Sequence, residues 1–352
     1  MLAVPRRWSD VTADWMTAAL AGRHPGAVIG DVRVGPVDDG TNARARVALA
    51  YTRGEGPPAV FVKRSGRLVP RLALVALRAL GTEARLAASG VVLPLPHPRP
   101  YAGGVRPARL GTVVVMDDVT VAGGVPNDAA SPLSVAAVGA GLEGLARLHA
   151  GFPAAGLPTA LGFLRPWRLG PAWAEISVAS LARGIGLLAR LGGDGILPPG
   201  LDSRRLGRQF AASARLAATG PQCVLHGDPH PGNTYALEAG GTGFLDWQLA
   251  RIGHWSHDVG YFLAGSLSAD DRRVAERALL AQYLDAVARA GGEAPSWDEA
   301  WARYVATPAF GLATWLHTLS FGRLQPVDAC VVTIARFAAA YADLETSRSA
   351  VA

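Results

Sequence analysis

The chain is predicted to fold as an α+β protein with two lobes, a small antiparallel β-rich N-terminal lobe and a larger, mostly helical C-terminal lobe. Three observations predict this class. The length of 352 residues, half of them hydrophobic, exceeds what one small core needs. Alternating apolar and polar runs cluster before residue 66. Apolar-periodic segments typical of helices dominate after residue 133. We place the lobes at residues 1–117 and 118–352.

The first lobe begins with a helix expected over residues 8–22, with Ser9 or Asp10 as its cap. A helical pattern also covers residues 70–89. Between these helices, turns rich in Gly, Pro, Asp and Asn separate three alternating runs, which predict an antiparallel meander: VIGDVRVG, ARARVALAY and AVFVKR. The later run GTVVVMDDV predicts another buried strand, which ends at the boundary between the lobes.

The second lobe opens with an apolar-periodic helix over residues 133–150. A compact β patch with a Gly-Gly turn interrupts the later helices at CVLHGD and NTYALEAGGTGFLDW. Patterns that begin at Ser268 and Ser296 are typical of capping boxes and predict two helix starts. The charge-free stretch 305–322 contains a proline, a histidine and several hydroxyl side chains, which favours a buried helix over a membrane span.

Charge and cysteine usage limit the classes of partner. The net charge of +6 suits anionic ligands, but the chain has no basic run with interleaved aromatic residues, so we expect no nucleic-acid partner. Cys223 and Cys330 stand far apart and show no metal or redox spacing. The first 15 residues lack the apolar core of a signal peptide. We therefore expect a cytoplasmic protein without membrane association.

Lysine occurs once in the chain, at position 63 within AVFVKRS, whereas the other 33 of the 34 basic residues are arginines. An ammonium is a compact point charge that can bind phosphate oxygens and a carboxylate together, while arginine presents a broad planar fork. Lys63 ends the third predicted strand, and Glu83 lies on the helix that follows. This arrangement predicts that Lys63 binds phosphate and that Glu83 fixes its position. The alternatives are a surface lysine and a solvated glutamate.

The densest group of reactive side chains lies in HGDPHPGNTYALEAGGTGFLDWQ. Asp228 and Asn233 share a loop rich in Pro and Gly, and a short hairpin would return Asp246 beside them. Phosphoryl transfer from a nucleotide needs a carboxylate that orients the attacking hydroxyl, and an amide oxygen and a second carboxylate that hold Mg²⁺ against the phosphates. These three residues fit those roles, although an isolated Asp and Asn at this spacing would form a turn in most proteins.

At this point the sequence resembles a known group. HGDPHPGN followed by FLDWQ, and preceded by FVK and MDDVT, is similar to the aminoglycoside phosphotransferase and choline kinase superfamily. This superfamily is the small-molecule branch of the protein-kinase-like fold, and the resemblance covers nearly the whole chain in order. The DWQ ending and the later HDVGYFL resemble the ecdysteroid-kinase-like branch. The resemblance implies a nucleotide-binding first lobe and a catalytic, substrate-binding second lobe.

The resemblance also implies a role for each residue of the site. Asp228 would be the catalytic base, and Asn233 and Asp246 would bind Mg²⁺. Lys63 would contact the α- and β-phosphates of ATP, with Glu83 as its partner. The reaction implied is transfer of the γ-phosphoryl group to a hydroxyl of a small molecule.

Further residues are assigned by the resemblance to the nucleotide and to loop support. His226 and Asp258 would brace the catalytic loop by hydrogen bonds. The nucleotide loop has one glycine where the family has a glycine-rich series. The resemblance assigns Gly40, Thr41 and Asn42 to this loop. It assigns Met116, Asp117 and Asp118 to the strand end whose backbone would contact the adenine.

Two other functions use the same residues. His226, Asp228 and His230 form an H-x-D-x-H pattern that could bind Zn²⁺ in a metallohydrolase, with His254, His257 or Asp258 as a further ligand. That interpretation leaves the lone lysine without a purpose. A non-catalytic nucleotide-binding pseudokinase is the second alternative.

The acceptor is expected to enter the helical lobe near Asp228. Residues 302–327 contain no Asp or Glu, so a polycationic aminoglycoside would find no acidic wall there. We therefore expect a neutral or apolar alcohol. Aromatic residues in and just before this region are more often core than pocket: Trp297, Trp301, Tyr304, Phe310, Trp315, His317 and Phe321.

Overall fold

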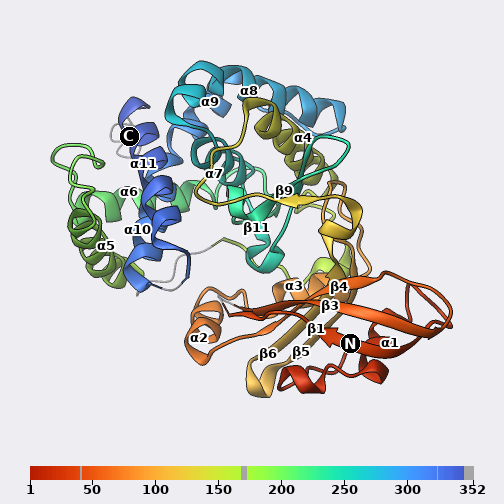
Figure 1. Cartoon of the computed structure of the whole chain (residues 1–352). Coiled ribbons are helices and arrows are strands. Elements are labelled where there is room, and N and C mark those ends of the chain that lie inside the picture. Colours follow the sequence, from red (N-terminus) through yellow and green to blue (C-terminus); the bar gives the residue numbers. More distant parts are fainter. Residues whose placement is uncertain (40–41, 168–172, 323, 345–352) are drawn as a thin grey trace.

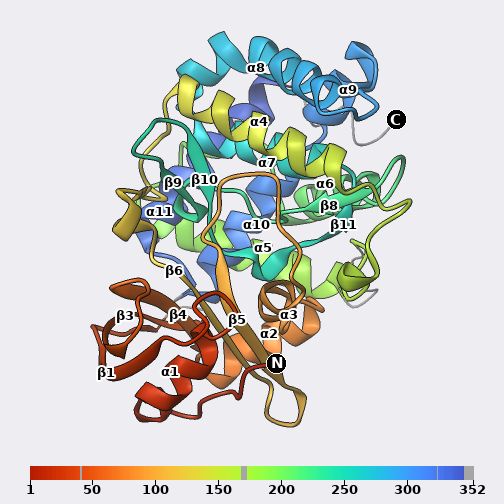
Figure 2. The same ribbon diagram turned by 90° about the vertical axis from the view of Figure 1, so that its right-hand side faces the viewer.

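The computed structural model describes residues 1–39, 42–167, 173–322 and 324–344. It confirms the predicted α+β class. A sheet with a few helices, built by the first third of the chain, lies below a larger, mostly helical part (Figure 1). Figure 2 shows the same two parts after a quarter turn. The boundary between residues 117 and 118 stays a prediction, and β6 (Gly111–Asp117) ends beside it.

The N-terminal sheet has the strand order β1-β3-β4-β6-β5, with the short β2 beside β3, and its pairings are antiparallel. Besides β6, its strands are β1 (Val28–Val34), β2 (Asp38–Asp39), β3 (Asn42–Arg53), β4 (Ala59–Ser65) and β5 (Pro100–Arg106). The three strands of the predicted meander and the later buried strand are confirmed.

β5 was not predicted, because its centre carries Gly103 and Gly104 in place of a β-forming pattern. Both glycines are required by close packing. A Cβ atom at Gly103 would overlap the backbone carbonyl of Ala84, and one at Gly104 would overlap the carbonyl of Leu2. The strand therefore lies against a helix and the N-terminal segment at a distance that only glycine allows.

Alternation of side chains gives the sheet two different faces. On the outer face, valines of the central strands pack against α1 (Ala13–Leu20): Val47, Val60, Val62, Val113 and Val115. On the inner face, Phe61, Val114 and Met116 pack with Ala84 of α3 (Thr82–Ala88). Lys63 pairs with Val114 across β4 and β6, so it also lies on the inner face.

The predicted start of the first helix is wrong. Residues Trp8–Asp10 form a separate 3-10 turn, and α1 begins after Thr12, whose hydroxyl accepts a hydrogen bond from the Trp15 amide at 3.3 Å. The carboxylate of Asp10 accepts from the amides of Arg6 and Arg7 at 2.7 and 3.1 Å. Asp10 thus closes the preceding turn instead of capping the helix.

The helix predicted over residues 70–89 is two helices, α2 (Leu68–Ala76) and α3. Gly81 separates them in the left-handed conformation, with φ of 79°. A Cβ atom there would lie 3.1 Å from a methyl group of Val105. The break redirects the chain so that Glu83, in the first turn of α3, is buried against the sheet.

The helical part contains α4 (Val135–Gly151), α5 (Trp173–Arg190), α6 (Ser203–Leu216), α7 (Ser256–Ser266), α8 (Ala269–Arg289), α9 (Trp297–Val305), α10 (Pro308–Phe321) and α11 (Val327–Asp343). The predicted helix starts are confirmed, because Ser268 and Ser296 accept from the amides of Asp271 and Glu299. α10 is a buried helix of the main core, as predicted. Each helix of the described residues is too short or too polar to span a bilayer.

Short strands lie between these helices. β9 (Thr234–Ala236) and β10 (Thr242–Phe244) form the predicted hairpin, whose turn contains Gly240 and Gly241 at positive φ. β7 (Val125–Pro126) pairs with β9. β8 (Cys223–Leu225) does not join this hairpin, and pairs instead with β11 (Arg251–Gly253). The segment between β8 and β9 is thereby held at both ends.

Candidate active site

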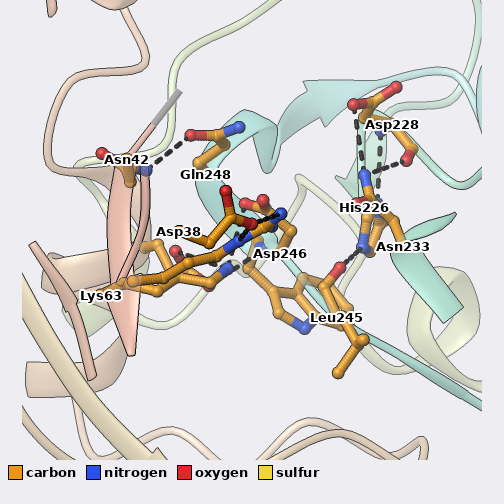
Figure 3. A network of polar contacts seen from close by, with 12 residues as sticks. Asp38, Asn42, Lys63, His226, Asp228, Asn233, Leu245, Asp246 and Gln248 are labelled. Atoms are coloured by element: carbon orange, nitrogen blue, oxygen red, sulfur yellow. Dashed lines mark hydrogen bonds and ion pairs between the residues drawn. The ribbon is translucent and has the colours of Figure 1, made fainter. Parts of the chain in front are cut away.

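Lys63 connects the sheet to the helical part of the chain (Figure 3). Its Nζ is 3.0 Å from Oε1 and 3.3 Å from Oε2 of Glu83, and 3.3 Å from Oδ1 of Asp246. The residue is only 7% exposed. Burial by itself would lower the pKa of Lys63, but the negative charges of Asp246 and Glu83 outweigh it and raise this pKa. The ammonium therefore stays protonated while it holds two carboxylates.

Glu83 supports both sides of this contact. Besides Lys63, its Oε1 accepts a hydrogen bond from the amide of Trp247 at 3.2 Å. Burial raises the pKa of Glu83, and the charge of Lys63 opposes that effect. A buried carboxylate of this kind needs its cation, so Lys63 and Glu83 stabilise one another. Through the Trp247 amide, α3 is also tied to the residue that follows Asp246.

Asp246 adopts a left-handed conformation, with φ of 60° and ψ of 74°. This conformation is uncommon outside glycine and occurs where the surrounding structure imposes it. Two hydrogen bonds do so here, one from the Leu245 amide to the carbonyl of Asn233 at 2.7 Å, the other from the Trp247 amide to Glu83. Burial alone would raise the pKa of Asp246, but Lys63 lowers it, so its carboxylate is charged. Its Oδ1 is buried and, among the described residues, is contacted by the Lys63 ammonium as an ion pair without a well-directed hydrogen bond.

Asp228 and Asn233 form the other side of the cluster. The side-chain nitrogen of Asn233 donates to the backbone oxygen of Asp228 at 3.0 Å and to its Oδ2 at 3.3 Å. The amide oxygen of Asn233 is thus the atom left for a further ligand. Burial, together with the charge of Asp246, raises the pKa of Asp228 to about 8. In the view of Figure 3, Asp246 lies between Lys63 and the Asp228–Asn233 pair.

His226 and Asp258 hold the loop that carries Asp228. Asp258 accepts from the amides of His226 and Gly227 at 2.6 and 2.9 Å. The His226 ring accepts from the Asp228 amide at Nδ1, at 3.3 Å, so it is Nε2 that donates to the carbonyl of Leu245 at 2.8 Å. Burial lowers the pKa of His226, consistent with this neutral form. The ring therefore joins the loop of Asp228 to the strand end that precedes Asp246.

The nucleotide loop is only partly described. Gly40 and Thr41, two of its predicted residues, lie outside the described residues. Asn42 begins β3, and its side-chain nitrogen donates to Oε1 of Gln248 at 3.0 Å. This bond joins the sheet to the turn that follows Asp246 (Figure 3). A small pocket, partly open to solvent, is lined by Asn42 and Gln248 together with Lys63 and Glu83.

The strand end that is predicted to contact adenine makes hydrogen bonds and ion pairs with other residues of the protein. The Met116 side chain packs on α3, and the Asp117 amide donates to the carbonyl of Arg99 at 3.0 Å. The carboxylate of Asp117 pairs with Arg23 at 3.2 Å, and that of Asp118 with Arg46 at 2.6 Å. Contact of this backbone with adenine stays a prediction.

The described geometry places one ammonium beside two carboxylates, with an amide oxygen and a third carboxylate next to them. The family model of the phosphotransferase enzymes matches residues 36–305, most of the chain and every residue of this cluster. The chain belongs to the phosphotransferase enzyme family. The predicted superfamily and the predicted enzyme class, a phosphotransferase, are thereby confirmed.

Solved structures of this enzyme class have the same fold. A choline kinase from Cryptosporidium parvum shares 12% identity at a TM-score of 0.51, covering 89% of each chain. A choline kinase from Streptococcus pneumoniae shares 13% at 0.50, covering 94% of this chain and 98% of the other. A spectinomycin phosphotransferase bound to ADP and spectinomycin shares 14% at 0.50, covering 93% and 98%. No curated protein matches the sequence. The ecdysteroid-kinase-like assignment stays a prediction.

Some residues of the site were not predicted. Gln248 follows the Asp246–Trp247 pair, and nothing in the sequence signals its role; its side chain accepts the hydrogen bond from Asn42. His149 of α4 donates through Nε2 toward Asp258 at 3.3 Å and contacts the Tyr283 hydroxyl at 2.8 Å. Tyr261 of α7 lies near Asp228 and lowers the pKa of that carboxyl, against the larger effect of burial. A histidine on an apolar helix face gives no sequence signal of its partner, because that partner lies on another element.

The histidines of the zinc alternative have other partners. His254 Nδ1 contacts the Ser256 hydroxyl at 2.9 Å, and the His257 ring lies against Trp167. His230 Nδ1 accepts from the Gly232 amide at 3.2 Å. Within the described ranges, no three His, Cys, Asp or Glu side chains are grouped as a metal-ligand set. Family membership and these contacts both favour the phosphotransferase over a zinc hydrolase.

Proposed function

We propose that the enzyme transfers the γ-phosphoryl group of ATP, with Mg²⁺, to a hydroxyl of a small neutral or apolar alcohol. One observation carries this proposal: the single lysine of the chain lies 3.0 Å from Glu83 and 3.3 Å from Asp246. A buried ammonium held between two carboxylates, one of them suited to a metal ion, is what the binding of a metal-bound triphosphate requires.

Lys63 would contact the α- and β-phosphates. Because Glu83 fixes its ammonium from one side, Lys63 is held in place before the nucleotide arrives, and little side-chain entropy remains to be lost on binding. Glu83 acts through Lys63 and through the Trp247 amide, so we assign it a positioning role. Asn42 and Gln248 would close the site at the nucleotide loop.

The residues present fit a hard divalent cation. Asp246 Oδ1 is buried and, in the part of the chain that the structure describes, has the ion pair with Lys63 but no well-directed hydrogen bond. The side-chain nitrogen of Asn233 is engaged by Asp228, which leaves its amide oxygen for a ligand. Carboxylate and amide oxygens are the ligands that Mg²⁺ prefers. When bound, Mg²⁺ would neutralise negative charge on the phosphates. We assign Asn233 and Asp246 to hold it.

Asp228 would hold the acceptor hydroxyl and take up its proton. At the same time the acceptor oxygen would form a bond to the γ-phosphorus, and the bond from that phosphorus to the departing ADP oxygen would break. The side-chain nitrogen of Asn233 holds the carboxylate in place. The cluster thus contributes mainly orientation and charge neutralisation. His226 and Asp258 keep the loop of Asp228 aligned with Asp246.

One observation supports a neutral or apolar acceptor. Residues 302–327 lack acidic side chains. Structural relatives of the enzyme include choline kinases and a spectinomycin phosphotransferase, which supports a small-molecule acceptor; they do not bear out its neutrality, since choline is a cation. Four of the seven aromatic residues suggested for this region are core, since each is at most 8% exposed: Tyr304, Phe310, Trp315 and His317. The cytoplasmic location and the absence of nucleic-acid and membrane partners stay predictions.

A transfer screen tests the proposal. The enzyme is incubated with γ-labelled ATP, with and without Mg²⁺, against alcohols, sterols, sugars and antibiotics, and Asp228→Asn serves as the control. We expect label in a neutral or apolar alcohol, only with Mg²⁺ and only with the unmodified enzyme. Selective labelling of an aminoglycoside would contradict the proposed acceptor. ATP binding without transfer to any compound would favour the pseudokinase.

A further inference from the structure

The inner face of the sheet carries an arginine beside the strand of Lys63. Arg46 of β3 is opposite Phe61 of β4, and Phe61 is opposite Met116 of β6. Directly opposed residues of antiparallel strands share a face, so Arg46 lies on the same face as Lys63. Phe61 precedes Lys63 by two residues, so this row lies about 7 Å from the lysine along the strand, toward the end of β6.

Arg46 is held by a buried carboxylate. Its Nε lies 2.6 Å from Oδ2 of Asp118, with the Arg46 side chain 59% exposed and the Asp118 side chain 5% exposed. The other oxygen of Asp118 accepts from the amide and the hydroxyl of Thr120 at 3.0 and 2.7 Å. Asp118 is therefore fixed by the turn after β6. It forms an ion pair with the guanidinium at Nε, and much of the Arg46 side chain remains open to solvent.

Suppose that the phosphates of a nucleotide contact Lys63 and its base contacts the Asp117–Asp118 segment. The nucleotide would then lie along the inner face of the sheet, next to Arg46 and Phe61. A guanidinium held at one edge presents a flat cationic surface, and such surfaces stack on aromatic rings. We propose that Arg46 is a base-binding residue: its guanidinium, oriented by Asp118, stacks on the purine of the nucleotide. This inference rests on the proposed function and adds a residue that selects the base.

The test separates base contacts from phosphate contacts. Titration calorimetry measures binding of ADP and of inorganic tripolyphosphate, which has no base, to the full chain and to Arg46→Met. Loss of one cation–π contact should weaken ADP binding about 3- to 30-fold. Tripolyphosphate binding should be unchanged. Arg53→Met is the matched control, because Arg53 lies at the far end of the same strand, exposed, with its Nε donating to the Gly26 carbonyl.

A second variant distinguishes a loss of stacking from a loss of folding. Arg46→Met leaves the Asp118 carboxylate buried without a cation and can destabilise the protein. Arg46→Lys keeps a positive charge near Asp118 but lacks the guanidinium plane, so it should also bind ADP more weakly, with wild-type thermal unfolding. Wild-type ADP affinity in Arg46→Lys would overturn the stacking role. An equal loss for ADP and tripolyphosphate would overturn it as well, since Arg46 would then bind phosphate. If the unmodified enzyme bound neither compound, the proposed function itself would fail.

Discussion

Replacing Lys63 by arginine tests whether the site requires a compact ammonium. The substitution keeps the charge and changes the shape of the cation. In the enzyme, one nitrogen lies within 3.3 Å of both Glu83 and Asp246, and the residue is 7% exposed. A guanidinium spreads its donors over a plane, so it has to abandon one carboxylate or displace its neighbours.

The magnitude follows from these contacts. Losing one charge-assisted hydrogen bond costs about 1.5–3 kcal/mol. If that contact is lost in the transition state, kcat/KM falls about 10- to 150-fold, at 1.36 kcal/mol for each factor of ten. The larger side chain overpacks a buried site, which lowers the free energy of unfolding by about 1–3 kcal/mol.

The assay measures kcat/KM for ATP with the acceptor found in the transfer screen, and denaturant unfolding in parallel. Lys63→Met is the comparison variant. It removes the cation and leaves Glu83 and Asp246 buried without a partner, which costs about 3–5 kcal/mol of stability. We therefore expect Lys63→Met to be more damaging than Lys63→Arg in both measurements. Wild-type kcat/KM in Lys63→Arg would refute the requirement for a compact ammonium, even if its stability fell.

Three further predictions follow from the same geometry. Asp228→Asn should lower kcat by about 10²- to 10⁴-fold, the usual contribution of a general base, with ADP affinity intact; a loss of ADP affinity equal to the loss of kcat would contradict this role. Glu83→Gln keeps an acceptor for the Trp247 amide but loses the charge that fixes Lys63, so in a double-mutant cycle it should add little to Lys63→Met; full additivity would show that Glu83 acts independently. Burial lowers the pKa of His254 to about 3 and of His317 to about 4, below the unfolded value near 6.5. Their stabilisation is complete above pH 6.5 and is lost as the pH falls toward 4, by up to about 1.4 kcal/mol per pH unit for each histidine, so the urea midpoint should be lower at pH 5 than at pH 7; equal midpoints would count against this.

Much of the fold could be predicted because its signals are local. The alternation in AVFVKRS and its two neighbouring runs predicted three strands, and the same alternation places Lys63 on the face opposite the buried valines. The Gly-Gly turn predicted the β9–β10 hairpin, which brings Asp246 back to Asn233. Where the signal was ambiguous, the prediction was wrong. The break at Gly81 was not predicted because the helical pattern is continuous there, and β5 was not predicted because its centre carries glycines.

The sequence by itself determined which chemical groups were available: one lysine, a strand that ends with it, and a loop and hairpin that carry Asp228, Asn233 and Asp246. Only the tertiary structure decided which of them meet. Lys63 and Asp246 are 3.3 Å apart although they lie 183 positions apart in the chain, and Arg46 pairs with Asp118. The reason is physical. Propensity and alternation act over a few neighbouring residues, whereas ion pairs between distant segments depend on how whole elements pack, and that packing is set by the shape of buried surfaces.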